Sequence, residues 1–252
     1  QQHNVSISGG TEKTNFLLSG TYDFNGGLMV NNDFSRYAFQ FKLNHQIAKN
    51  LKFGLNARVN DQTVNGSGTQ GGTYKIRTSQ AITSAATKGL SGFTTVDTSN
   101  MSDDEYEQYI ENNMSLSEQA QRYWKKQNTR GYNFNMSLDW TIIKGLIAHT
   151  EVGYGYGFKE IKDWWGSTTT QASYVGGLPL ADWTKTNTRT MREETNLTYN
   201  FKVNKDHNFN VMVGQEVSSG QSDYNYMYAT KYSKAYSAED VFNNFGLYNG
   251  VS

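Results

Sequence analysis

Residues 132–140 read Tyr132-Asn-Phe-Asn-Met-Ser-Leu-Asp-Trp140, so that apolar and polar side chains alternate without a break. Successive side chains of a β-strand point to opposite faces, and this segment would therefore form a strand with one apolar and one polar face. In an α-helix the same apolar residues would be scattered around the whole circumference. The segment predicts a strand that lies between an apolar phase and water.

The same alternation recurs in both directions along the chain. It is clear over residues 37–44, 51–59, 146–158 and 197–203, where Thr150 is the one polar residue on the apolar side. It is weaker in the first 24 residues. The pattern predicts eight strands, near residues 4–9, 15–24, 35–47, 51–60, 128–140, 146–158, 190–203 and 208–217.

The connections between these strands alternate in length. The short ones are residues 9–14, 48–50, 141–145 and 204–207, and the long ones are residues 25–34, 61–127, 159–189 and the segment from 218 onward. Outer-membrane barrels have short turns in the periplasm and long loops outside, whereas a soluble β-sandwich has no reason to place every long loop at one end. The fold class is therefore predicted as all-β, with residues 1–252 forming part of one antiparallel transmembrane β-barrel domain.

Aromatic residues and composition agree with this fold. Tyr and Phe residues gather at the loop ends of the predicted strands, and Trp140 and Phe201 lie near the turn ends, as in the aromatic girdles of such barrels. The mean hydropathy is −0.71 although 14% of the residues are aromatic, which suits a protein with one apolar and one wet surface. No stretch of about 18 apolar residues exists, so no transmembrane helix is expected.

Other functional classes find little support in the sequence. The formal net charge is zero, which makes nucleic acid an unlikely partner by charge. The chain has no Cys and therefore no disulfide or thiolate metal site. Gly66-Ser-Gly-Thr-Gln-Gly71 fits the GxGxxG pattern of dinucleotide-binding proteins, but no parallel βαβ unit follows it. We interpret it as a flexible loop and expect no cofactor.

Four residues are candidates for contact with a ligand. Trp164 and Trp165 fall in the predicted loop 159–189, where exposed indoles stack on sugar rings, although they could equally form loop core or anchor the membrane rim. His149 and Glu151 share the polar face of one strand and could contact an ion or substrate, although the polarity of a barrel lumen explains them as well. No metal-ligand spacing and no Ser/His/Asp arrangement is found, so no metal site and no enzymatic activity is expected.

The long connection 61–127 is predicted to contain structure of its own. Ser102 with Glu105, and Ser115 with Glu118, match the capping box that begins a helix. These motifs predict helices near residues 103–113 and 116–126, with a third possible over 76–88. An insertion of this length is usually functional.

Several stretches within residues 4–60 carry a family resemblance. They are Val5-Ser-Ile-Ser-Gly-Gly-Thr-Glu-Lys-Thr-Asn-Phe16, Ser19-Gly-Thr-Tyr22, Gly26-Gly27, Arg36-Tyr37 and Leu51-Lys-Phe-Gly-Leu-Asn56. These residues resemble the first barrel strands of the SusC/RagA family of TonB-dependent transporters, and Lys144-Gly-Leu146 matches in style. The resemblance implies a barrel of about 22 strands, filled by a plug and capped by a SusD-like lipoprotein. Such proteins import glycans or peptides with energy delivered by TonB.

From this resemblance we expect the wall and extracellular loops of a multi-pass importer in the bacterial outer membrane. The expected partners are outer-membrane lipid, a SusD-like surface lipoprotein, TonB through a segment that this sequence does not show, and an oligosaccharide or peptide substrate. The plug domain and the remaining strands are not recognised within residues 1–252. The alternative is a self-contained eight-stranded barrel that acts as an anchor or adhesin, whose interior would be filled by side chains.

Overall fold

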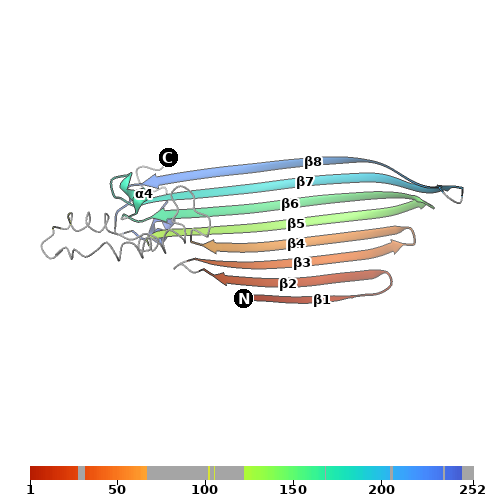
Figure 1. The fold of residues 1–252 in the computed structure, drawn as a ribbon, viewed down its shortest axis with the longest axis horizontal. Helices are drawn as coiled ribbons and strands as arrows, with labels where there is room; N and C mark the ends of the chain where they lie inside the picture. The colour runs from red at the N-terminus through yellow and green to blue at the C-terminus, as the bar shows by residue number, and fades with distance from the viewer. Residues whose placement is uncertain are drawn as a thin grey trace.

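The computed structural model of the protein describes residues 1–27, 32–66, 102, 105, 122–167, 169–204, 207–234 and 236–245. These residues form one antiparallel sheet in which the eight strands follow one another in sequence order. The strands are β1 (Gln2–Gly10), β2 (Thr14–Gly26), β3 (Asp33–Ala48), β4 (Leu51–Asn65), β5 (Tyr123–Ile143), β6 (Leu146–Trp165), β7 (Leu180–Val203) and β8 (His207–Thr230). Figure 1 shows them side by side, with the turn between β3 and β4 at one end of the sheet and α4 at the other. The predicted fold class, an antiparallel barrel segment of eight strands, is confirmed.

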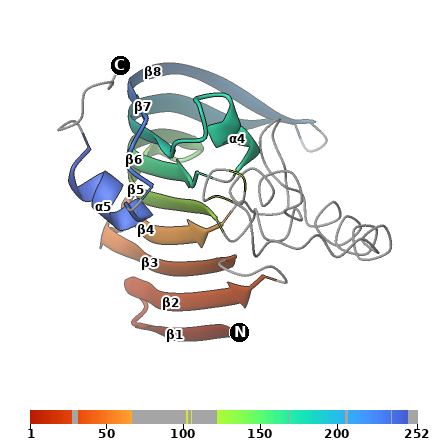
Figure 2. The same ribbon diagram turned by 90° about the vertical axis from the view of Figure 1, so that its left-hand side faces the viewer.

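The sheet is open in the structure. β1 and β8 are its two edges, and among the described residues they pair with β2 and β7 respectively and not with each other. Figure 2 shows the two edge strands at opposite ends of a curved layer. In lipid, an open edge would leave a row of N–H and C=O groups without hydrogen-bond partners, which is why membrane-spanning sheets close into barrels. The eight strands therefore form an arc of a barrel wall.

Strands β5 to β8 are longer than the sequence pattern predicts. Residues 159–165, 180–189 and 218–230 were predicted as loop, and this was wrong because they continue β6, β7 and β8. A tilted strand crosses the hydrocarbon core in about 9–11 residues, whereas β7 and β8 have 24 residues each. About half of each strand therefore projects beyond the membrane. There both faces meet water or protein, so the alternation that marked the membrane-spanning part no longer applies.

The two faces of the sheet keep the predicted separation of apolar from polar residues. Phe41 pairs with Ala57, and Ala57 pairs with Phe134, so the apolar residues of neighbouring strands share one face. Large side chains on this face stay uncovered, with Met136 at 50% and Val213 at 67% exposure. Rows of this kind are buried in a soluble protein, and a sheet that leaves them uncovered is suited to lipid. We call this the outer face and the polar side the inner face.

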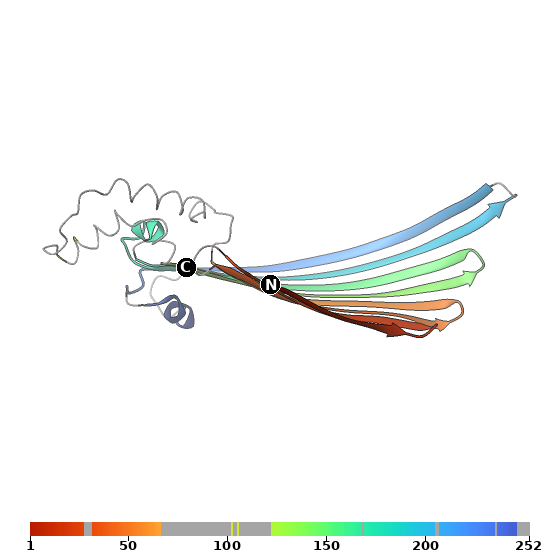
Figure 3. The same cartoon turned by 60° about the horizontal axis from the view of Figure 1, so that its bottom comes forward.

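Two short helices cover the sheet beyond this apolar band. α5 (Ala238–Asn243) packs Val241 and Phe242 against Ala181 and Ala229 of the outer face. Its N-terminus is closed by a reciprocal capping box between Ser237 and Asp240. Figures 2 and 3 show α5 at the loop end of the sheet, on the side opposite α4.

α4 (Thr170–Ser173) covers the inner face at the same end of the sheet. Its Ala172 packs with Trp165 and Leu180, and all three are buried. No helix among the described residues is long and apolar enough to cross a membrane. Together with α5, this helix gives the projecting half of the sheet a protein core, which the lipid-facing half does not need.

The turn between β5 and β6 requires glycine at its second residue. Gly145 has φ +87°, and a Cβ atom built on it would lie 2.2 Å from the carbonyl oxygen of Asn200. The Gly145 carbonyl also accepts a hydrogen bond of 2.7 Å from the Asn200 N–H. Glycine thus provides both the left-handed backbone and the close approach of β7 at this turn.

The predicted helices of the connection 61–127 fall largely outside the described residues. The first capping box is formed, because Ser102 N–H and Oγ both donate to Glu105 Oε2 at 2.9 Å and the Glu105 N–H donates to Ser102 Oγ at 3.3 Å. The helix predicted over 116–126 is wrong at its end, since residues 123–126 belong to β5. The pair Ser115 and Glu118 and the segment 76–88 lie outside the described residues.

Candidate functional site: the polar inner face

His149 and Glu151 lie on the inner face of β6, in two adjoining rows of polar side chains. His149 Nδ1 lies 2.7 Å from Asp139 Oδ1 of β5, its cross-strand partner. Glu151 is paired with Glu194 of β7, and Glu194 is paired with Glu216 of β8. The two candidate residues are therefore not joined in one site, but each belongs to a different charged group on the wall.

Two of the three carboxylates in this row, Glu194 and Glu216, are held by a single arginine. Arg192 donates from Nε and Nη2 to the two carboxylate oxygens of Glu216 at 3.0 and 3.1 Å, and from Nη2 to Glu194 at 2.7 Å. A bidentate guanidinium–carboxylate pair of this kind fixes both side chains. Sequence reasoning missed Arg192, Glu194 and Glu216, although their alternation along the predicted strands placed them on the inner face.

Small and amide-bearing residues make the rest of the inner face flat and hydrophilic. Gln40 donates to Asn56 at 3.1 Å, and Asn44 donates to Asn15 at 3.0 Å. A Cβ atom at Gly155 would lie 2.4 Å from Thr190 Oγ1, so the absence of a side chain lets its neighbour lie across it. Such a wall offers many hydrogen-bonding groups and little apolar surface.

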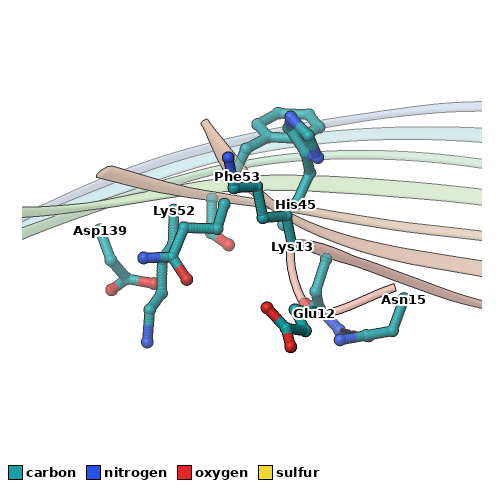
Figure 4. Close-up of a pocket in the computed structure, with 11 residues that line it drawn as sticks. Glu12, Lys13, Asn15, His45, Lys52, Phe53 and Asp139 are labelled. Atoms are coloured by element: carbon teal, nitrogen blue, oxygen red, sulfur yellow. Dashed lines mark hydrogen bonds between the residues drawn. The ribbon is translucent and has the colours of Figure 1, made fainter. Parts of the chain in front are cut away.

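A shallow hollow of about 340 Å³ lies at the turn end of this face. Glu12, Lys52 and Asp139 are among the residues that line it, with His45 and Phe53 at its border. Figure 4 shows Lys52 and Asp139 on one side of the sheet and the rings of His45 and Phe53 on the other. A second hollow, of about 150 Å³, adjoins it and includes Glu151 in its lining.

Trp164 and Trp165 lie at the end of β6 and not in a loop, which corrects their predicted position. They point to opposite faces, because Trp164 packs with the outer cluster around Val241 and Trp165 with the inner cluster around Leu180. Trp165 is only 8% exposed, and its ring lies 5.5 Å from that of Tyr123. The structure thus places the two indoles in the cores beneath α5 and α4, and does not bring them together as an exposed pair.

A charged cluster lies beside Trp165 on the projecting part of the inner face, above the lipid-facing band. Lys125 Nζ lies 3.2 Å from Asp163 Oδ2, and both residues are only 8% exposed. The Tyr123 hydroxyl donates to the other oxygen of Asp163. Burial, with the Asp163 carboxylate second, raises the pKa of Tyr123 above its usual value.

Asp182 stands opposite Asp163 on the neighbouring strand and brings a second carboxyl group to the cluster. Tyr226 donates to Asp182 Oδ1 at 2.9 Å. Burial is the largest effect on Asp182 and raises its pKa above the usual value. The Tyr226 hydrogen bond lowers the pKa, the Asp163 charge raises it further, and the Lys125 charge lowers it. One ammonium group therefore stands beside two carboxyl groups.

Three tyrosines follow one another along the inner face of β8 at this end. Tyr224, Tyr226 and Tyr228 stand opposite Thr186, Thr184 and Asp182 of β7. Tyr224 is 65% exposed and Tyr226 is 50% exposed. We call these three residues the tyrosine row. Sequence reasoning missed it, although the Tyr-x-Tyr-x-Tyr alternation was visible, because residues from 218 onward were interpreted as loop.

Chemically, the inner face is suited to polar contacts and to ring stacking. Among the described residues, no group of three or more His, Asp or Glu side chains is arranged to hold a metal ion. The aromatic rings of the tyrosine row offer flat surfaces, and the threonines, asparagines and carboxylates around them offer hydrogen bonds. This combination of groups is suited to contact with molecules that carry both apolar surfaces and many polar groups.

Comparisons with known proteins agree with the fold. No family model matches the chain. A "TonB-dependent receptor P3" from Formosa agariphila is 26% identical over 226 residues, which cover 87% of this chain and 21% of that protein. The solved structure of the RagAB peptide transporter matches with a TM-score of 0.66 and 17% identity, over 91% of this chain and 25% of that one. The siderophore receptor PiuA from Acinetobacter baumannii matches with a TM-score of 0.56 and 11% identity, over 90% of this chain and 29% of that one.

The chain therefore spans about a fifth of the curated relative's length and between a quarter and a third of the length of these two solved chains. The resemblance to TonB-dependent transporters indicated by residues 4–60 is confirmed, because the curated relative is a TonB-dependent receptor and the two solved structures share the fold of this chain.

Proposed function

We propose that this chain, which resembles the SusC/RagA type of TonB-dependent receptor, forms part of the wall of a barrel that imports a nutrient across the bacterial outer membrane. The observation that carries the proposal is the division of the sheet into an uncovered apolar outer face and a hydrogen-bonding inner face. A wall with this division separates lipid from a polar interior. TonB would supply the energy through a segment of the receptor other than these strands.

The alternative, a self-contained eight-stranded barrel that serves as an anchor or adhesin, receives less support. Closure of such a barrel would require β1 to pair with β8, and in the structure these strands lie at the two ends of an arc. The match to larger transporters extends over nine tenths of the chain. We also propose that the chain has no enzymatic role, and that its charged inner-face residues serve contact and not chemistry.

The proposed substrate is an oligosaccharide, with a peptide as the second candidate. Hydroxyl groups of Thr184, Thr186 and Thr188 lie on the inner face beside the tyrosine row. Exposed rings beside hydroxyl groups suit the alternating apolar and polar faces of a sugar. The peptide candidate is supported by the structural similarity to RagAB, which is a peptide transporter.

A surface lipoprotein of the SusD type is the proposed partner. The projecting halves of β5 to β8 form a rim above the lipid-facing band, stabilised by α4 on one side and α5 on the other. A rigid rim outside the membrane is a suitable platform for a protein that delivers substrate to the barrel mouth.

The test is uptake by cells that carry the intact receptor. Fluorescent oligosaccharides and fluorescent peptides of matched size would be supplied to cells with the gene, without the gene, and with TonB deleted. We expect import of one of the two classes that requires both the receptor and TonB. If neither class enters in a receptor-dependent and TonB-dependent manner, the transport proposal is wrong.

The tyrosine row provides the residue-level test. Tyr224→Ala with Tyr226→Ala should lower uptake at equal surface amounts of receptor, because each lost stacking contact is worth on the order of 1 kcal/mol. Tyr37→Ala is the control, since Tyr37 is 61% exposed but lies on the outer face. Equal uptake by both variants would remove the tyrosine row from the substrate path.

A further inference from the structure

Two lysines stand directly opposite each other on the projecting outer face. Lys126 of β5 and Lys162 of β6 are cross-strand partners. Both are half-buried, and among the described residues neither has a carboxylate within ion-pair distance. Like charges placed directly opposite on neighbouring strands destabilise a sheet. The carboxylate of the same row, Asp33, lies two strands from Lys126 and accepts a hydrogen bond from Asn65. An anion bound beside the lysine pair would offset the repulsion within it.

The surroundings of this pair add further positive charge. Lys162 Nζ lies 4.6 Å from the ring centre of Trp183, and Lys185 Nζ lies 4.0 Å from the same ring. Glu160 accepts a hydrogen bond from Trp183 Nε1 at 2.9 Å and lies 3.9 Å from Lys185. One carboxylate thus serves the indole and one ammonium group, and it leaves the Lys126–Lys162 pair without compensation.

Two arginines continue the positive surface toward the membrane. On the outer face, Arg189 stands opposite Tyr156, in the row that also contains Tyr132, and Arg130 lies one row beyond it, opposite Phe158. Arg130 pairs with Asp61 at 2.7 Å but remains 56% exposed, and Arg189 is exposed. We call Lys126, Arg130, Lys162, Lys185 and Arg189 the basic belt.

The basic belt has more cations than anions. The carboxylates on the same face at this height are Asp33, Asp61, Glu160 and, on β8, Asp223, so the five cations of the belt face four carboxylates. Glu193 lies lower on β7, at the upper edge of the lipid-facing band, where Thr195 donates to it. Above the belt α5 covers the sheet, because Phe242 contacts Trp183 and Lys162. The belt is thus open toward the membrane surface and closed on its far side.

We propose that the basic belt binds the phosphate groups of an anionic glycolipid in the outer leaflet. Its position immediately outside the lipid-facing band is the height of lipid headgroups, and lysines and arginines in that zone attract headgroup phosphates. Arg130 and Arg189 would meet phosphates at the membrane surface, and the Lys126–Lys162 pair would meet phosphates on the sugars above it. Bound lipid would relieve the repulsion within the lysine pair.

The experiment uses the intact receptor purified from outer membranes in a mild non-ionic detergent. Purified lipopolysaccharide, the same lipopolysaccharide with its phosphates removed, and inorganic phosphate are the three probes, each titrated by native mass spectrometry or fluorescence. We expect binding of the phosphorylated lipid, weak binding of the dephosphorylated lipid, and no competition by inorganic phosphate at equal concentration. Binding should weaken as salt is raised. Equal binding of the two lipids, or full displacement by inorganic phosphate, would overturn the proposal.

Lys126→Gln with Lys162→Gln should weaken binding of phosphorylated lipid by roughly fivefold for each lysine removed. Lys159→Gln is the matched control. Lys159 is an exposed lysine on β6, the strand that carries Lys162, but its side chain lies on the inner face. The double variant should be at least as heat-stable as the wild type when lipid is absent, since a like-charge contact is lost. Unchanged lipid binding in the double variant, or an equal loss in Lys159→Gln, would contradict the assignment.

Discussion

Trp164 and Trp165 are adjacent in the sequence, yet they pack into two separate cores on opposite faces of β6. Trp164 contacts the outer cluster that includes Ala181 and Val241, and Trp165 contacts the inner cluster that includes Ala172. Because a strand alternates its side chains, one Trp-Trp pair can hold a helix on each side of the sheet. The pair joins α4 and α5 to the projecting part of the wall.

This packing predicts that Trp165→Ala destabilises the outer end of the sheet. Removal of a buried Trp side chain costs about 3–5 kcal/mol, and Trp165 is 8% exposed. Hydrogen exchange in residues 160–185 of the intact receptor should speed up, with no change in the lipid-facing strands. Trp140→Ala is the control, because Trp140 is 47% exposed on the outer face. Reduced uptake without faster exchange would instead indicate that Trp165 contacts substrate.

The ion pair between Lys125 and Asp163 gives a second prediction. Lys125→Met should destabilise the same region by about 3–5 kcal/mol, because it leaves a buried carboxylate without its partner. Arg130→Met is the comparison, since the exposed pair with Asp61 is worth at most about 1 kcal/mol and its side chains are 56% and 42% exposed. Protease resistance of the surface-exposed barrel would measure both. Similar losses in the two variants would show that the Lys125 pair is solvated.

Asp182 predicts how this region responds to pH. Burial raises its pKa in the folded protein, so the stabilisation that it contributes is present below the unfolded-state pKa and is lost as pH rises through the folded-state pKa. Asp182→Asn should therefore stabilise residues 160–185 at neutral pH and have little effect near pH 4, while an amide oxygen still accepts the Tyr226 hydrogen bond. The check is hydrogen exchange at both pH values, corrected for intrinsic rates. If Asp182→Asn stabilised this region more at pH 4 than at neutral pH, the raised pKa of Asp182 would be contradicted.

The sequence predicted the membrane-spanning part of this fold better than its outer end, for a physical reason. Lipid on one side and water on the other impose strict alternation, as at Phe134 and Asn135, and a single residue pattern reveals it. Beyond the lipid, residues 180–189 meet helices, water and other polar groups on both faces, so Thr and Lys occur on either side. These residues form a strand because they pair with β6 and β8, and the alternation of side chains along the sequence does not reveal such partners.

The candidate site was predictable to a similar extent. His149 and Glu151 were placed correctly on the inner face by parity alone, but their partners Asp139 and Glu194 required the cross-strand register. Trp164 was interpreted as a loop residue because the indole pair ends the regular pattern. Register is set by turns such as Gly145, and only the structure shows which residues it brings side by side.

Gly145 gives a prediction about assembly. Gly145→Ala would combine a left-handed backbone, which costs an L-residue on the order of 1 kcal/mol, with a clash of its Cβ against the Asn200 carbonyl oxygen at 2.2 Å. We expect less folded barrel in the outer membrane, measured by heat-modifiable migration in gels. Gly157→Ala should assemble normally, because its Cβ would find only Thr188 Cβ, at 3.9 Å. Equal yields of both variants would mean that the turn can shift to accept a side chain.

The assignment of the two faces gives the most direct prediction. Arg at Phe41 or Leu138 would place a charge in the lipid-facing band, where it costs about 2–4 kcal/mol at the membrane midplane. Arg at Asn56 or Asn135 would lie on the hydrogen-bonding inner face. Asn135 is the residue next to Phe134, whose side chain faces lipid. Folded receptor in the outer membrane should fall for the first pair and stay near the wild-type amount for the second. Leu138 and Asn135 lie on the same strand, β5, and Phe41 and Asn56 lie on the adjacent strands β3 and β4, so differences in local strand stability largely cancel. Equal losses in both pairs would contradict the lipid-facing assignment, and a loss confined to the inner-face pair would reverse it.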